Sequence, residues 1–174
     1  MTYFDNLCAA MSLLADQPNS IFIGQAVEYE GTAMYNSLKH LPSEKRLELP
    51  VFEDCQMGMA TGLSLTGYLP VCIYPRINFL LLATNQLVLH LDKLPIYGNG
   101  FKPKVIIRTA IATPTPLDPG PQHLGDFTYV LEEALETIHV SQMFFTDEIL
   151  PSYQKAIERE GSTLLIEYME LYAK

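Results

Sequence analysis

Short apolar runs rich in β-branched residues recur along the chain and alternate with segments of helical periodicity. The first helical segment is followed by the strand-like run IFIG at residues 21–24, and its apolar face comprises Phe4, Leu7, Met11 and Leu14. The strand-like runs are apolar throughout and do not alternate in polarity, which is typical of parallel strands covered on both faces. This pattern predicts an α/β fold of three layers, with a mostly parallel sheet of about six strands and helices on both faces.

The expected elements can be placed by their residue ranges. Besides 21–24, the expected strands are 47–52, 69–74, 104–111, 138–145 and 162–169. Besides the N-terminal helix, the expected helices are 31–40, 53–66, 77–94, 127–137 and 148–160, with Gly67 ending the second of these. The chain has 174 residues, which suits a single domain spanning 1–174.

The charge and composition exclude several classes of function. A net charge of −9 leaves no basic face for nucleic acid or an anionic membrane surface. The most apolar run is interrupted by Asn85, Gln86 and His90, which makes it too short for a membrane span. The N-terminus lacks a basic leader, so we expect a cytoplasmic protein.

The 3 cysteines are far apart, which argues against a disulfide framework or a zinc site. Hydrophobic residues make up 48% of the chain, and this excess predicts a homo-oligomer, at least a dimer.

A proline-rich segment, 109–127, cannot form a helix or an interior strand. It directly follows the expected strand 104–111, and its prolines are Pro114, Pro116, Pro119 and Pro121. Loops after the carboxyl ends of parallel strands commonly bind ligands, so this loop and its histidine, His123, are candidates for a site. A plain exposed connector fits the composition equally well.

The segment EDCQMGMATG, residues 53–62, carries two acids at its start and two glycines inside an expected helix. Glu53 lies at a strand-to-helix junction, where it could face the same cleft as His123. Taken alone, Glu53 and Asp54 are more simply interpreted as acids at a helix N-terminus. Gly58 and Gly62 are one turn apart and bare one stripe of backbone, either for a partner or for tight packing within the domain.

A glutamate followed by glycines at this spacing resembles the signature of the pyrimidine-binding domain of thiamine diphosphate enzymes. The surrounding stretches GQAVEYEGTAMYNSL, PVFEDCQMGMATGLSLTGYLPVCIYPRINF, KPKVIIRTAIA and GPQH occur in the order seen in the β-subunit of 2-oxo acid dehydrogenases and the central domain of transketolase. The resemblance runs from about residue 22 to residue 168. It implies thiamine diphosphate as the cofactor.

The resemblance also implies roles for particular residues. Glu53 matches the glutamate that hydrogen-bonds N1′ of the aminopyrimidine and promotes proton removal from the thiazolium ring, a catalytic role. Phe79 matches the aromatic residue that stacks on the pyrimidine, although it could be an ordinary core phenylalanine. His123 matches the catalytic histidine near the substrate carbonyl. Gly58 and Gln122 complete the implied cofactor-binding set, with Gly58 on a helix at a subunit interface.

The sequence departs from the family pattern at three places. Gly24 is followed by Gln25 and Ala26, where two acids are usual, and His123 is followed by Leu124 instead of a small hydroxyl residue. The motif that holds the diphosphate and its Mg²⁺, Gly-Asp-Gly with a distant asparagine, is missing, and the chain stops where a β-subunit would continue.

We therefore expect half of an active site and no metal site in this chain. The Mg²⁺ and the diphosphate would be held by a separate α-like diphosphate-binding subunit, in a homo-oligomer or heterotetramer. The expected reaction is cleavage next to a 2-oxo group, by decarboxylation of a 2-oxo acid or by ketol transfer. Two alternatives remain open: a non-catalytic interaction or regulatory protein that keeps the fold, and an unrelated α/β nucleotide binder, although no glycine-rich phosphate loop follows any expected strand.

Overall fold

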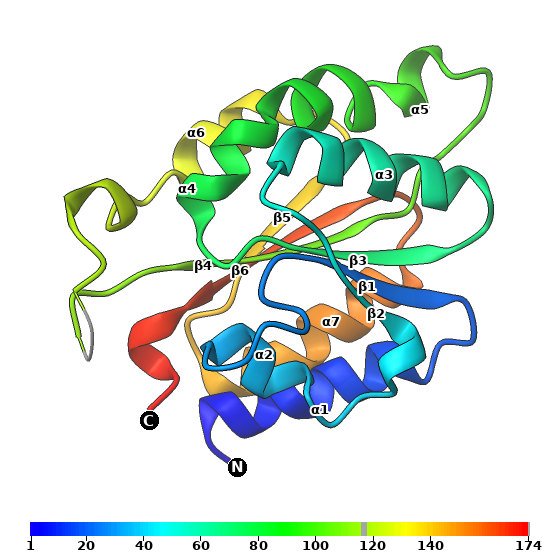
Figure 1. Ribbon diagram of the computed structural model, residues 1–174. Coiled ribbons are helices and arrows are strands. Elements are labelled where there is room, and N and C mark those ends of the chain that lie inside the picture. The colour runs from blue at the N-terminus through cyan, green and yellow to red at the C-terminus, as the bar shows by residue number, and fades with distance from the viewer. Residues whose placement is uncertain (116–117, 174) are drawn as a thin grey trace.

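The backbone forms one parallel sheet of six strands between two layers of helices in the computed structural model, which describes residues 1–115 and 118–173 (Figure 1). The strand order is β2-β1-β3-β4-β6-β5, and every neighbouring pair is parallel. The strands are β1 (Ser20–Gly24), β2 (Arg46–Glu48), β3 (Leu69–Ile73), β4 (Ile106–Ile111), β5 (His139–Gln142) and β6 (Thr163–Tyr168). The expected α/β fold is confirmed. Of the expected loop prolines, Pro116 lies outside the described residues.

The helices divide between the two faces of this sheet (Figure 1). One face is covered by α1 (Tyr3–Ala15), α2 (Ala33–Leu38) and α7 (Ile149–Glu158). The other is covered by α3 (Glu53–Leu65), α4 (Ile77–Leu80), α5 (Leu94–Tyr97) and α6 (Thr128–Ala134). No helix of the described residues is long and apolar enough to cross a membrane.

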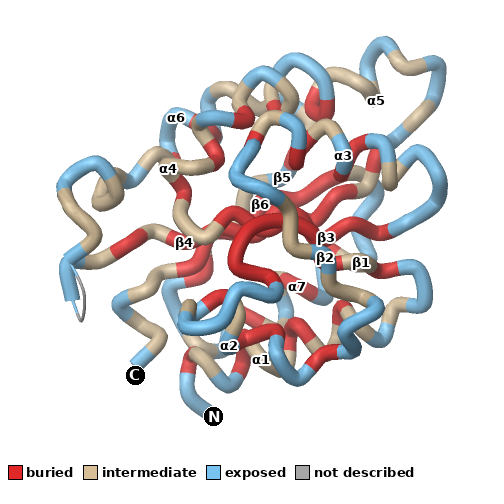
Figure 2. The backbone as a smooth tube through the Cα atoms, viewed as in Figure 1, coloured by how far each residue is buried: buried red, intermediate tan, exposed pale blue. Residues whose placement is uncertain are grey.

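Successive side chains of the central strands point to opposite faces of the sheet and pack into two separate cores, as the pleat of a strand requires. Phe22 and Val71 are fully buried in the core beneath α1, α2 and α7. Their neighbours Ile23 and Cys72 are fully buried in the core on the α3 side. Figure 2 shows the result, a buried centre with most of the exposed residues on helices and loops. A sheet buried on both faces explains why the strand-like runs of the sequence are continuously apolar.

The prediction of a buried strand at 47–52 was largely wrong. β2 ends at Glu48, although the Leu49 N–H still donates to the Gly24 carbonyl at 2.8 Å. The next residue, Pro50, has no N–H with which to continue the ladder. Val51 and Phe52 are exposed at 78% and 64%, so the apolar run that precedes Glu53 faces outward.

The expected long helix 77–94 is present only in pieces. After α4, the chain passes through a 3₁₀ turn at Leu81–Ala83 and a π-helical segment at Asn85–Leu91 before α5 begins. The Thr84 hydroxyl donates to the Leu81 carbonyl at 2.9 Å, a local bond that competes with the helical ladder. The π-helical segment ends just before Asp92, which is fully buried. Its carboxylate accepts hydrogen bonds from the backbone N–H groups of residues 136–138.

The first expected interior helix is also shorter than predicted. The range 31–40 yields only α2, with Thr32 as its N-cap accepting from the Tyr35 N–H at 3.1 Å. The end predicted for the glycine-bearing helix is confirmed, because α3 stops at Leu65 and Gly67 adopts a φ of 87° two residues later.

Candidate functional site

The three principal residues expected at the site all follow the carboxyl ends of strands. Glu53 comes after β2, Phe79 after β3 and His123 after β4. Because these strands are parallel, their carboxyl ends share one edge of the sheet, the edge at which α/β folds bind ligands. The topology therefore brings the three expected residues to one side of the molecule, where α4 packs on the turn at Pro121–His123.

Glu53 is the first residue of α3 and is buried, with 5% of its surface exposed. Its Oε1 atom is buried and has no hydrogen-bond partner among the described residues. Glu53 and Asp54 lie in the first turn of α3, as the simpler interpretation of acids at a helix N-terminus expects, but a helix dipole does not supply a hydrogen bond to the buried Oε1 atom. A desolvated carboxylate oxygen without a partner normally costs free energy, so such groups often mark functional sites.

A buried tyrosine fixes the backbone of Glu53. The Tyr74 hydroxyl donates to the Glu53 carbonyl at 2.9 Å, and Tyr74 itself is fully buried directly after β3. Burial raises the pKa of Tyr74 far above its ordinary value, with a further contribution from the neighbouring Cys72 thiol. The hydroxyl therefore remains a donor at all physiological pH values and holds the start of α3 against β3.

The approach of α3 to the strand ends also requires a glycine. The Gln56 amide donates to the Ile73 carbonyl at 2.8 Å, close beneath Gly24, which has a φ of 139°. A Cβ atom at Gly24 would lie 2.3 Å from the Ile73 oxygen and 2.7 Å from Gln56 Nε2. Only glycine fits this contact, so Gly24 and Gln56 together set the depth at which α3, and hence Glu53, sits above the sheet.

Phe79 and His123 are in direct contact. Their ring centroids are 5.3 Å apart and the rings are tilted by 51°. The exposed Gln122 places its Nε2 atom 3.3 Å from His123 Nε2. The other ring nitrogen, Nδ1, is buried and has no partner among the described residues. His123 can thus offer a hydrogen bond to a ligand.

The loop that follows β1 is held by an acid that the sequence analysis did not single out. Glu48, the last residue of β2, accepts backbone N–H bonds from four consecutive residues, 26–29, at 2.7 to 3.3 Å. Ala26 has a φ of 60°, so the loop needs this support. No local signal marks Glu48, because its partners lie about twenty residues upstream and meet it only through the β1–β2 pairing.

A cavity of about 650 Å³ opens beside this loop at the same edge of the sheet. Gln25, Glu48, Val51 and Arg76 contribute to its lining, and Gln25 Nε2 and Arg76 Nε are buried without partners. Glu53, Phe79 and His123 are not among its lining residues. The cavity therefore adjoins the candidate site and is not identical with it.

Gly58 and Gly62 differ in their surroundings. A Cβ atom at Gly58 would meet the side chain of Gln86 at 3.6 Å, an ordinary contact within the chain. A Cβ atom at Gly62 would meet nothing within 4 Å. Tight packing within the domain therefore explains neither glycine fully, and it does not explain Gly62 at all.

The residues that the structure describes include no cluster of three or more potential ligands that could hold a metal ion.

Comparison with known proteins bears on the fold of this chain and on the resemblance that its sequence indicates. The chain is 33% identical over 111 residues to a pyruvate dehydrogenase E1 component subunit beta from Gracilaria tenuistipitata var. liui. This match covers 60% of the chain and 34% of that relative. Among solved structures, a split gene transketolase described as an inactive beta4 tetramer matches with a TM-score of 0.63 at 17% identity, over 95% of the chain and 50% of that structure.

No protein-family model matches the chain. The two likenesses confirm the resemblance that the motif at Glu53 indicates, and the second confirms the transketolase-like fold. The chain spans about a third of the curated relative and half of the structural one, so neither likeness extends to a whole enzyme.

Proposed function

We propose that this chain is the pyrimidine-binding subunit of a split thiamine diphosphate enzyme that acts on a 2-oxo acid or a ketose. The observation that carries the proposal is Glu53, a buried glutamate with an unpartnered oxygen, at the position of the family's pyrimidine glutamate. The contact between Phe79 and His123 at the same edge of the sheet supports it. When bound, thiamine diphosphate supplies the nucleophilic carbon and the electron sink for cleavage next to the 2-oxo group.

The residues present fit the pyrimidine half of this cofactor. Glu53 Oε1 can hold a proton shared with a ring nitrogen, because burial at the helix start leaves that oxygen without competing donors. Phe79 offers an aromatic face for packing. His123 can offer a hydrogen bond to the substrate oxygen, and its contact with Gln122 restrains the imidazole ring.

The resemblance assigns the diphosphate and its Mg²⁺ to a separate subunit. The described residues contain no metal-ligating cluster, and Mg²⁺ in such sites is held by oxygen ligands and phosphates. We assign these contacts to a separate diphosphate-binding subunit. An exposed apolar surface at α3 is available to such a partner, formed by Val51, Phe52, Met59 and Leu65.

Calorimetry with thiamine diphosphate and Mg²⁺ tests the proposal directly. The chain alone should bind weakly and catalyse nothing, whereas addition of the diphosphate-binding partner should give tight, Mg²⁺-dependent binding and 2-oxo acid or ketose cleavage. Glu53→Gln should abolish turnover and leave the complex assembled, since it removes the proton-sharing group and little volume. The control is Glu44→Gln, which makes the same charge change at an exposed residue before β2 and should retain turnover.

Two results would contradict the proposal. Submicromolar binding of thiamine diphosphate by the chain alone would show that it holds the diphosphate itself. Full activity of the Glu53→Gln complex would remove the role given to that carboxylate.

A further inference from the structure

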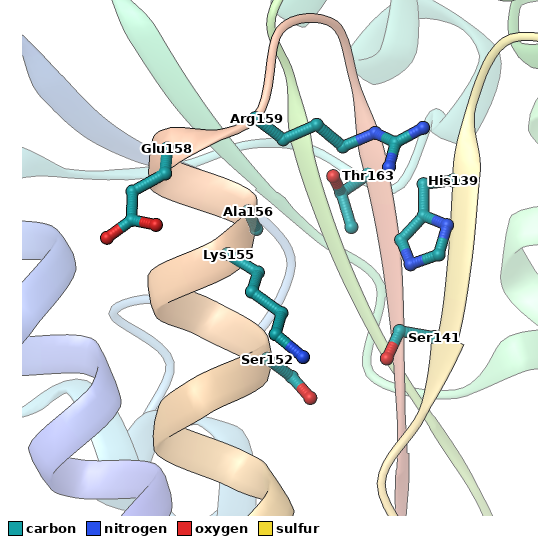
Figure 3. A pocket seen from close by; sticks show the side chains of 8 residues that line it. All are labelled: His139, Ser141, Ser152, Lys155, Ala156, Glu158, Arg159 and Thr163. Carbon is teal, nitrogen blue, oxygen red and sulfur yellow. The ribbon is translucent and has the colours of Figure 1, made fainter.

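A second pocket lies at the opposite edge of the sheet from the candidate active site. Its volume is about 400 Å³, and it is enclosed by the C-terminal half of α7 and the amino ends of β5 and β6 (Figure 3). His139 is the first residue of β5 and Thr163 the first of β6, which fixes the pocket at the amino edge. The resemblance to thiamine diphosphate enzymes gives this pocket no role.

Three basic side chains surround the pocket, from two separate parts of the chain. Lys155 and Arg159 come from α7 and its C-cap, and His139 comes from β5. Within residues 1–115 and 118–173, none of the three forms an ion pair. In a chain with a net charge of −9, three unpaired basic groups around one space are unexpected.

The acid of the lining does not neutralise them. Glu158 accepts a hydrogen bond from the Gln154 amide at 3.0 Å, along the outer surface of α7. In Figure 3 its carboxylate points away from the space that Lys155 and Arg159 border. The interior of the pocket is therefore positively charged, and it is lined by hydrogen-bond donors.

Hydroxyl groups complete the lining. In Figure 3 the Ser152 hydroxyl and the Lys155 amine extend from α7 toward β5, and the Ser141 hydroxyl extends from β5 toward them. Thr163 is 2% exposed, and its Oγ1 is buried without a partner among the described residues. Figure 3 shows this hydroxyl beneath the aliphatic stem of Arg159, on the side facing α7. A buried hydroxyl costs about 1–3 kcal/mol when it is left unpaired.

The charges around His139 also favour an anion in the pocket. Burial lowers the pKa of His139 below its ordinary value, and the like charges of Arg159 and Lys155 lower it further. These two cations, from α7 and its end, are the charged groups that face His139, while β6 contributes the neutral Thr163. An anion in the pocket would reverse this repulsion and favour protonated His139.

We propose that this pocket binds the phosphate group of a small metabolite. Arg159 can engage two phosphate oxygens with its planar fork, Lys155 supplies a second charge, and the hydroxyls of Ser141, Ser152 and Thr163 donate to the remaining oxygens. A cavity of about 400 Å³ holds more than a phosphate ion, and ligand sites of roughly 300–1,000 Å³ are usual for small molecules. The pocket would thus sense a phosphorylated compound away from the active site.

Titration of the isolated chain, followed by two-dimensional NMR, tests this without thiamine diphosphate or a partner. The probes are inorganic phosphate, sulfate and ribose 5-phosphate. All three should cause saturable chemical-shift changes confined to β5, β6 and the end of α7. If the natural ligand is a phosphate ester, ribose 5-phosphate should bind most tightly. If it is the free ion, inorganic phosphate should bind most tightly. Sulfate affinity should rise as the pH falls through the His139 pKa, because sulfate keeps its charge between about pH 5.5 and 8 while His139 gains a proton.

Substitutions separate a built site from general attraction. Lys155→Gln and Arg159→Gln should each weaken phosphate binding by about 2- to 5-fold, which is the range for exposed charge pairs. Thr163→Val should weaken it as well, at nearly constant volume. The control is Lys102→Gln, which removes a positive charge paired with Glu160 outside this pocket and should leave binding unchanged.

The proposal is overturned if the shifts do not saturate, or if Lys102→Gln weakens binding as much as Lys155→Gln. Either result would indicate an adventitious ion only. A His139 pKa unchanged by saturating sulfate would also count against it, since a bound dianion at this position must raise that pKa.

Discussion

Gly62 offers a sharp test of why α3 tolerates glycines. A residue in the middle of a helix gains about 0.5–1 kcal/mol when glycine is replaced by alanine, provided that the new methyl group fits. At Gly62 the methyl would meet nothing within 4 Å, so the full gain is expected in the isolated chain. For a chain of this size, that corresponds to an increase in Tm of about 1–4 °C. At Gly58 the new methyl would make an ordinary contact with Gln86 at 3.6 Å, so Gly58→Ala should give a similar gain and serves as a comparison on the same helix.

The same position then separates folding from assembly. Gly62→Leu should keep the isolated chain folded, because its side chain extends from an exposed part of α3. It should also prevent assembly if this face meets a second copy of the chain or the diphosphate-binding partner, since a bulky side chain would hold the two surfaces apart. Denaturant unfolding followed by circular dichroism measures the first effect, and sedimentation of the same samples measures the second. The reasoning fails if Gly62→Ala lowers the stability of the isolated chain, or if Gly62→Leu assembles like the parent.

Two further predictions concern the core and the site. Arg108 is fully buried and donates to Glu167 at 2.6 Å and to Ser37 at 2.8 Å, so Arg108→Met should cost about 3–5 kcal/mol by leaving the Glu167 carboxylate without its cation. The Tyr153 hydroxyl also donates to Glu167, at 2.7 Å, and a loss below about 1 kcal/mol in chemical unfolding would mean that such neutral donors suffice. His123→Ala, in the complex with the partner, should lower kcat and leave thiamine diphosphate affinity nearly unchanged, and an equal loss of cofactor affinity would place His123 on the cofactor and not on the substrate.

Much of the fold could be predicted from the sequence, because the information is local. The strands at IFIG and LPVCIY are apolar on both faces, and the helices between them have caps or glycine stops that act within a few residues. The edge strand β2 could not be placed as well. As an edge strand, β2 pairs with a neighbour, β1, on one side only. Pro50 ends this pairing at a point where the apolar pattern alone predicts that the strand continues. The segmented helix after β3 escaped prediction because Asp92 is anchored by residues 136–138, far along the chain.

The candidate site shows the same division. Glu53, Phe79 and His123 could be selected from the sequence because the family resemblance rests on short motifs around them, and each follows the carboxyl end of a strand. The groups that hold them in place could not, because Tyr74, Gln56 and Glu48 act through contacts across the sheet edge. Nothing in the sequence near these three residues distinguishes them from ordinary polar residues.

The two edges of the sheet differ in how their polar groups are satisfied, and this difference bears on function. At the carboxyl edge, the unpartnered buried atoms include an acid and a histidine nitrogen, on Glu53 and His123, which suits proton transfer. At the amino edge, the groups are Thr163 and the unpaired cations Lys155 and Arg159, which suits binding of a stable anion without proton transfer. β6 and β4 pair along six residues between these edges, from Ile106–Thr163 to Ile111–Tyr168. A ligand at the amino edge that orders the start of β6 would therefore act on a strand whose far end lies at the carboxyl edge. Such coupling would appear as a change in turnover when phosphate is added to the assembled enzyme, and Lys155→Gln should abolish that change.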